Sequence, residues 1–151
     1  MLLLLLLLNT SHTLGIGAGI YPNGTLSIKF CSAPTTVFQL TAGFGGLGGY
    51  YGDMALGGRA LFGMSSGGNS VQYTHFLGVG AGIHTWNNSS YHGIYHESGA
   101  WILGEGFYEC ELFFSPEVPL SVEIGIGLDL VLANGFGLGW GPLLGIHYYL
   151  K

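Results

Sequence analysis

Apolar residues recur at every second position in several stretches of this chain, with small or polar residues between them. The clearest stretch runs from Leu120 to Leu130, where apolar side chains alternate with Ser, Glu, Gly and Asp. Successive side chains of a β-strand point to opposite sides, so this segment has one apolar wall and one polar or empty wall. Similar stretches, separated by Gly-, Pro- and Ser-containing turns, predict an all-β protein. The predicted strands are Thr13–Tyr21, Thr25–Cys31, Thr35–Gly45, Met54–Met64, Ser70–Trp86, Ala100–Phe114, Leu120–Leu132 and Phe136–Leu150.

The composition indicates where the apolar walls point. Only 7% of the 151 residues are charged, whereas 48% are hydrophobic; ordinary globular chains carry about 25% charged residues. We therefore expect most of the exterior not to contact water. No internal run reaches the roughly 18 apolar residues of a membrane-spanning helix. Because a bilayer tolerates no unpaired strand edge, the sequence predicts an eight-stranded antiparallel up-and-down transmembrane β-barrel.

The alternation also predicts which side chains form the outer wall of this barrel. An arginine at a lipid-facing mid-strand position such as Ile124 is expected to destabilise the fold. The predicted outer wall includes Leu26, Ile28, Phe30, Phe38, Leu40, Leu56, Phe62, Leu77, Val79, Val122, Ile124, Ile126 and Leu128.

The links between the predicted strands alternate in length. Compact links follow the second, fourth and sixth strands, whereas Gly46–Asp53 and Asn87–Gly99 are longer and aromatic-rich. Short turns at one end, where both termini would lie, and longer loops at the other are typical of an outer-membrane barrel. We divide the chain into an apolar N-terminal segment, residues 1–12, and a β-barrel domain, residues 13–151. The run Leu2–Leu8 is interpreted as a signal remnant or as residues of uncertain identity.

Several Gly- and aromatic-containing segments lie along the predicted strands: Gly15-x-Gly-x-Gly19, Leu26-Ser-Ile-Lys-Phe30, Gly57-Gly-Arg-Ala-Leu-Phe62, Gly78-Val-Gly-Ala-Gly82 and Gly145-Ile-His-Tyr-Tyr-Leu150. They resemble segments of small bacterial outer-membrane β-barrel proteins of the OmpA/OmpX type. The resemblance covers residues 13–151 and implies the bacterial outer membrane as the location. That family usually ends on an aromatic residue, whereas here Tyr148 and Tyr149 are followed by Leu150 and Lys151.

Nearly all charged residues of the strands fall on the inward wall. An eight-stranded barrel is only wide enough for its own side chains, so buried cations and carboxylates have to pair. We therefore expect a lumen filled by ion pairs rather than an open pore, and we expect Arg59 to contact at least one carboxylate. The predicted lumen network consists of Lys29, Gln39, Arg59, Glu105, Glu109, Glu123 and Asp129, with Glu111 placed beside them.

Closure of the barrel requires the first and last strands to pair. The alternation predicts Ile16–Ile20 beside part of Leu138–Ile146, since an open edge in lipid would leave backbone groups unpaired. Pro142 has no N–H and requires a bulge or a non-bonded position in the ladder. The glycines expected to meet along this seam are Gly15, Gly17, Gly19, Gly139 and Gly141.

The loop histidines suggest two kinds of chemistry that we do not favour. His92, His96 and Glu97 supply three metal donors within six residues, but they lie in a loop without a fixed frame. His96-Glu97-Ser98 with Glu109 resembles the His-x-Ser pair and carboxylate of lipid A deacylases, although that pair lies near the C-terminus in those enzymes. We predict no enzyme, no metal and no cofactor; the N-terminal glycines are not a dinucleotide loop, because no helix follows them.

The remaining histidines and the two cysteines are assigned by alternation. His75 falls on the outer wall unless a bulge turns it inward, and His84 and His147 fall on the inner wall. Cys31 and Cys110 lie on predicted strands, where two separate thiols are preferred over a disulfide.

Partner recognition is expected at the long-loop end. A net charge of −5 without a basic run argues against nucleic acid. The expected partners are membrane lipids and, through Asn87–Gly99, other envelope proteins. Aromatic belts are expected at both barrel ends: Tyr21, Tyr50, Tyr51, Trp86, Tyr91 and Trp101 at one, and Phe113, Phe114, Tyr148 and Tyr149 at the other. The loop residues assigned to recognition are Tyr50, Tyr51, Trp86, Tyr91, His92, Tyr95 and His96.

Three functions are compatible with these patterns. We favour a non-enzymatic outer-membrane barrel with a structural or adhesive role, or a role as an accessory subunit of an envelope complex. The first alternative is a soluble Gly-rich β protein that assembles into a filament or sheath. The second is a lipid-modifying outer-membrane enzyme, whose activity would be lost on Ser98→Ala.

Overall fold

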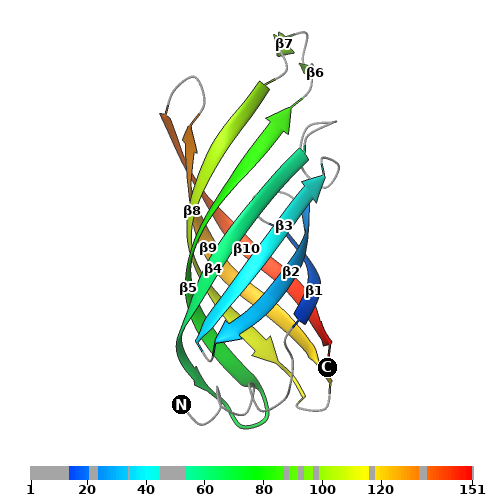
Figure 1. The fold of residues 1–151 in the computed structure, drawn as a ribbon, viewed down its shortest axis with the longest axis vertical. Helices are drawn as coiled ribbons and strands as arrows, with labels where there is room; N and C mark the ends of the chain where they lie inside the picture. The colour runs from blue at the N-terminus through cyan, green and yellow to red at the C-terminus, as the bar shows by residue number, and fades with distance from the viewer. Residues whose placement is uncertain are drawn as a thin grey trace.

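A computed structural model shows an all-β protein whose eight long strands form a closed antiparallel barrel in the order β1-β10-β9-β8-β5-β4-β3-β2 (Figure 1). The strands are β1 (Leu14–Ile20), β2 (Gly24–Ala33), β3 (Thr36–Phe44), β4 (Met54–Gly67), β5 (Gln72–Trp86), β8 (Gly99–Phe113), β9 (Leu120–Leu132) and β10 (Phe136–Leu150). The structure describes residues 14–20, 24–33, 35–44, 54–86, 89–91, 94–96, 99–115, 118–132 and 136–150. No helix in these ranges is long and apolar enough to cross a membrane.

All eight predicted strands are confirmed, and β9 and β10 have the predicted bounds. The largest difference at a strand end is in β4, which continues to Gly67 because a register shift between Gly63 and Ser65 lets the ladder with β5 resume. The turn after β4 requires glycine at Gly68, whose φ of 100° is unfavourable for other residues and where a Cβ would collide with the backbone of Val71.

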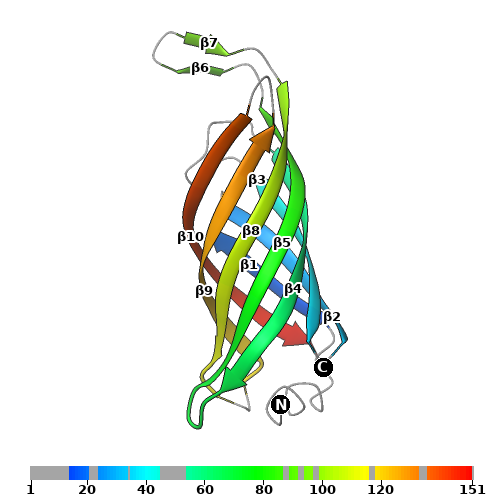
Figure 2. The same cartoon turned by 90° about the vertical axis from the view of Figure 1, so that its left-hand side faces the viewer.

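The sequence predicts an irregular loop at Asn87–Gly99, but part of this segment is regular. It contains a short hairpin of β6 (Ser89–Tyr91) and β7 (Ile94–His96), in which Ser89 lies opposite His96. The hairpin projects beyond the barrel at the end opposite to that where β10 terminates (Figure 2). Each of these two strands has only three residues, which is too few for an alternating pattern to be recognised in the sequence.

The two walls of the barrel differ in polarity as the alternation predicted. Every residue of the predicted outer wall points outward, and each is exposed except Val122, which is half-buried on the same face. Within the described ranges, every Lys, Arg, Asp and Glu points into the lumen: Lys29, Arg59, Glu105, Glu109, Glu111, Glu123 and Asp129. An apolar layer shares the lumen with them, formed by Val37, Leu61, Phe76, Phe107 and Leu143.

The barrel closes through β1 and β10, as predicted, but the register differs from the predicted one. Ile16 lies opposite Tyr148 and Ile20 opposite Leu144, so only the second half of β1 pairs within Leu138–Ile146. Alternation defines which side of a strand faces the lumen but does not define how far one strand slides along the next.

The predicted glycine-to-glycine seam is therefore wrong in part. Gly15 and Gly17 do face the lumen, but their partners on β10 are Tyr149 and His147, two of the bulky inward side chains. Only Gly19 lies opposite another glycine, Gly145. Gly139 and Gly141 pair with β9 and have no described partner on β1. A narrow lumen has room for a large side chain only where the neighbouring position has none. Glycine therefore lies opposite a large residue more often than opposite another glycine along this seam.

Pro142 lies in an uninterrupted ladder. It pairs with Ile126 of β9 without a register shift, so the bulge that we had considered is absent there. On the other side, β1 ends at Ile20 opposite Leu144, and no described residue of β1 pairs with Pro142. The missing N–H therefore falls where β10 has a described neighbour on one side only, as is usual for proline in sheets.

The predicted aromatic belt at the short-turn end is half correct. Phe114 and Tyr148 are 58% and 51% exposed, whereas Phe113 and Tyr149 are buried in the lumen with ring centroids 5.7 Å apart. Neighbouring strand residues point to opposite sides, so a Phe-Phe or Tyr-Tyr pair supplies only one outward ring. For the other belt, Tyr21, Tyr50 and Tyr51 lie outside the described residues, and only the backbone of Trp86, Tyr91 and Trp101 is described.

Candidate functional site

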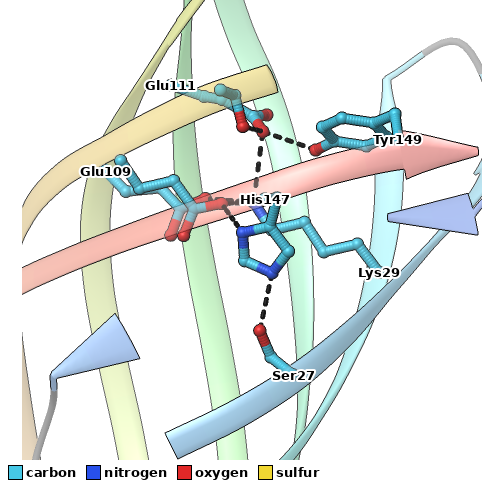
Figure 3. A network of polar contacts seen from close by, with 8 residues as sticks. Ser27, Lys29, Glu109, Glu111, His147 and Tyr149 are labelled. Carbon is cyan, nitrogen blue, oxygen red and sulfur yellow. Dashed lines mark hydrogen bonds and ion pairs between the residues drawn. The ribbon is translucent and has the colours of Figure 1, made fainter. Parts of the chain in front are cut away.

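A buried ion cluster surrounds Lys29 in the lumen (Figure 3). Its Nζ atom lies 3.0 Å from Glu109 Oε1, 2.5 Å from Glu123 Oε1 and 3.8 Å from Glu111 Oε1. Lys29 and Glu109 are fully buried, and Glu111 and Glu123 nearly so. The cluster thus places one ammonium group among three carboxylates supplied by β8 and β9.

His147 of β10 links the cluster to Ser27 of β2. Its Nδ1 lies 2.5 Å from Glu123 Oε1, and its Nε2 lies 2.6 Å from Ser27 Oγ. Ser27 and His147 are not on adjacent strands, because Gly17 of β1 lies between them in the ladder. A Cβ on Gly17 would collide with the imidazole ring and with the carbonyl oxygen of Ile146. The absence of a side chain at Gly17 therefore allows the contact between β2 and β10.

Glu111 is held by hydroxyl groups at the short-turn side of the cluster. Ser121 Oγ donates to Glu111 Oε1 at 2.6 Å, and the Tyr149 hydroxyl donates to the same oxygen. Glu111 and Glu123 lie directly opposite each other on β8 and β9. Like charges at such positions repel, so these hydroxyl donors and Lys29 together offset the repulsion.

A second ion pair joins Arg59 of β4 to Glu105 of β8. Arg59 Nε donates to Glu105 Oε2 at 2.6 Å, and the guanidinium lies 5.0 Å from the ring centroid of Phe107. Gly80 of β5 lies between the two partners in the ladder, and a Cβ there would approach Arg59 Cγ to 2.9 Å. The predicted contact of Arg59 with a carboxylate is confirmed.

Five of the seven predicted lumen residues thus fall into two groups. Lys29, Glu109 and Glu123 belong to the cluster around Lys29, and Arg59 and Glu105 form the second pair. Gln39 lies on β3 directly between Lys29 and Arg59, and Asp129 lies opposite Glu105 on β9. Three further polar partners were not assigned to the network from the sequence, although the same alternation places them inward, because the predicted network contained the charged side chains and Gln39 only. They are Ser27, Ser121 and Tyr149.

Ser27, His147 and Glu123 follow the order of a catalytic triad. Hydroxyl, imidazole and carboxylate are linked through the same ring atoms as nucleophile, base and acid in serine hydrolases. Two observations argue against this role. Ser27 is only 4% exposed, and Glu123 Oε1 is also in contact with Lys29. Since a nucleophile has to reach its substrate, we assign these contacts to the structure of the lumen.

The structure does not bring together the catalytic residues considered from the sequence. Glu109 binds Lys29 in the lumen. It lies ten positions along β8 from Gly99, about 33 Å at the rise of an extended strand. His96 ends β7 beyond the barrel (Figure 2). Glu97 and Ser98 lie outside the described residues.

The predicted recognition residues are only partly visible. Tyr50, Tyr51 and His92 lie outside the described residues, and Trp86, Tyr91, Tyr95 and His96 have only their backbone described, in β5, β6 and β7. Their role in recognition stays a prediction. In the part of the chain that the structure describes, no group of three or more His, Cys, Asp or Glu residues is arranged to hold a metal ion.

The assignments by alternation are confirmed for the histidines of the barrel. His84 and His147 point inward, and His75 lies on the outer wall, where its Nδ1 is 2.6 Å from the Tyr108 hydroxyl. Cys110 is a free thiol on the outer wall opposite His75. The side chain of Cys31 is not described.

We expect Arg59→Met to lower the free energy of unfolding by about 3 kcal/mol, because it leaves Glu105 buried without its ion-pair partner. The measurement is denaturant-induced unfolding in detergent or lipid vesicles. Glu105→Gln is the matched control. It retains a hydrogen-bond acceptor for Arg59 and should lower the free energy of unfolding by less than Arg59→Met does. Equal stability of wild type and Arg59→Met would contradict the importance of this pair.

No protein-family model matches this chain, and no curated protein matches its sequence.

Proposed function

We propose that the protein is an integral β-barrel of a bacterial outer membrane. The observation that carries the proposal is the inverted polarity of the barrel, with ionisable side chains inside and large hydrophobic side chains exposed on all sides. Examples from the eight strands are Ile16, Leu26, Leu40, Leu56, Val79, Ile102, Leu128 and Leu138, each 49–77% exposed. In water this surface would be costly, whereas in lipid it is the favoured one.

Strand length and closure support the same conclusion. A transmembrane β-strand needs roughly 9–11 tilted residues; β5, β8 and β10 each contain 15 residues. A closed barrel also pairs strand edges that lipid could not satisfy. Even strand numbers and antiparallel pairing are typical of bacterial outer-membrane barrels.

The proposed role is structural or adhesive, or that of an accessory subunit in an envelope complex, without catalysis and without a conducting pore. The ion cluster around Lys29 and the apolar layer around Phe76 fill the section of the lumen in which they lie. Other envelope proteins would then bind at the loop end, where the β6–β7 hairpin projects from the barrel.

Extraction from membranes tests the proposal. A membrane barrel should require detergent for solubilisation, and its folded form should migrate faster on a gel than the same sample after heating. A soluble subunit of a filament or sheath should instead sediment without lipid and show no such shift. Recovery in the soluble fraction without detergent would overturn the proposal.

A charge on the outer wall gives a second test. Ile124→Arg at the middle of β9 should lower the stability in lipid vesicles by about 2–4 kcal/mol, whereas Phe114→Arg just beyond the end of β8 should cost only about 0–1 kcal/mol. Folding into vesicles followed by denaturant titration measures both. Equal and small effects at the two positions would argue against a lipid-facing wall.

A further inference from the structure

The mostly apolar outer wall carries a polar cluster near the short-turn end. Tyr73 and His75 lie near the start of β5, and Tyr108 lies on the neighbouring strand β8. Ser65 lies opposite His75 on β4. Ser65 owes this position to the register shift after Gly63. All four side chains point away from the lumen.

The cluster has a defined geometry around His75. The Tyr108 hydroxyl is 2.6 Å from His75 Nδ1, and the two rings stack with centroids 5.7 Å apart and an interplanar angle of 17°. Tyr73 contacts the imidazole edge-on at 5.2 Å. When Tyr108 donates to Nδ1, the neutral imidazole carries its hydrogen on Nε2. Among the described residues, no hydrogen-bond partner faces this Nε2.

The outer wall changes from polar to apolar immediately after the cluster along β5. Leu77 and Val79 continue the same face of β5 and are 53% and 56% exposed. An imidazole N–H in the hydrocarbon layer would have no acceptor, whereas tyrosine and histidine side chains are well accommodated among lipid headgroups. The boundary between headgroups and hydrocarbon therefore falls between His75 and Leu77 if the barrel spans a membrane.

We propose that this cluster binds the phosphate group of a membrane lipid in the leaflet at the short-turn end. His75 Nε2–H and the hydroxyls of Ser65 and Tyr73 supply donors, and a phosphodiester oxygen supplies the acceptor that His75 lacks. The described outer wall carries no carboxylate that would repel the anionic group. The site rests on the proposed membrane function, because it is continuous with the apolar wall assigned to lipid.

The depth of the cluster is tested with spin labels on the full chain in vesicles of phosphatidylcholine and phosphatidylglycerol. In a Cys31→Ser, Cys110→Ser background, single cysteines replace Tyr73, Leu77 or Val79. Labels at 77 and 79 should be relaxed by oxygen, and the label at 73 by an aqueous nickel chelate. Oxygen access at all three positions would overturn the headgroup site but leave the membrane barrel intact. Nickel access at all three would overturn the membrane barrel itself.

The phosphate contact is tested by solid-state NMR on otherwise unaltered protein with ¹⁵N-labelled histidine in the same vesicles. We expect a ¹⁵N–³¹P dipolar contact that disappears in His75→Phe, which keeps a ring but removes the N–H. Tyr108→Phe should weaken the contact, because the tautomer is no longer held. A spectrum of wild type without any His75–phosphorus contact, in a sample whose labels at 77 and 79 report hydrocarbon, would overturn the proposal.

Discussion

Replacement of Lys29 by methionine should lower the free energy of unfolding by about 3–5 kcal/mol, the range for removing one partner of a buried ion pair. Methionine fills a similar volume, so the change removes the charge rather than the packing. Glu109 and Glu123 would then remain buried at short range without their ammonium partner, and Glu111 would lose its nearby cation. Equilibrium unfolding in denaturant, with detergent or vesicles present throughout, measures the loss.

The carboxylates provide the control for this prediction. Glu111→Gln alone removes one negative charge from a cluster in which three carboxylates share one ammonium group, so it should be nearly neutral or stabilising. In the Lys29→Met background, Glu123→Gln should restore part of the lost stability, because it removes one of the charges left unpaired. A loss below about 1 kcal/mol for Lys29→Met would show that the cluster is not a source of stability.

The side of each strand that faces the lumen could be predicted from the sequence because strand geometry has a period of two. Glu123 and Asp129 point inward, and Ile124 and Leu128 point outward, as the alternation along β9 requires. The closed barrel followed from the same pattern combined with the scarcity of charge. The first inference uses local information that a single strand contains, and the second adds the composition of the whole chain.

The relative positions of the strands could not be predicted in the same way. The contact of Ser27 with His147 depends on the register of two strand pairs, β2 with β1 and β1 with β10. A shift of two residues preserves every inward and outward assignment but changes every lumen partner. The sequence therefore identified the charged members of the lumen network, while the structure was needed to show that Lys29 and Arg59 belong to separate groups.

The glycines of β1 have a different role from the one predicted. Gly15 and Gly17 looked like one side of a seam of small residues, yet each lies beside a large side chain of β10. A Cβ on Gly15 would approach the Tyr149 ring to 2.9 Å. On its described residues, β1 thus contributes only glycine to the lumen, and side chains of its neighbours reach across it.

Substitution of Gly17 by valine should therefore be among the most damaging changes in the barrel. The new side chain would meet the ring of His147 and the carbonyl oxygen of Ile146, part of the backbone of β10 that closes the barrel. Overpacking of about 1–3 kcal/mol and the loss of the buried Ser27–His147 contact, about 1–3 kcal/mol, together give an expected destabilisation of about 4 kcal/mol.

The readout for Gly17→Val is closure itself, measured as the fraction of protein that keeps the faster gel mobility of an unheated, folded barrel. Gly106→Val is the matched control, since a Cβ on Gly106 of β8 would have no atom within 4 Å, and the same added bulk would project into open space. We expect the control to fold like wild type and Gly17→Val to lose most of the compact form. If the two variants behaved alike, the contact across β1 would not hold the terminal strands together, and backbone pairing of β1 with β10 would account for closure without it.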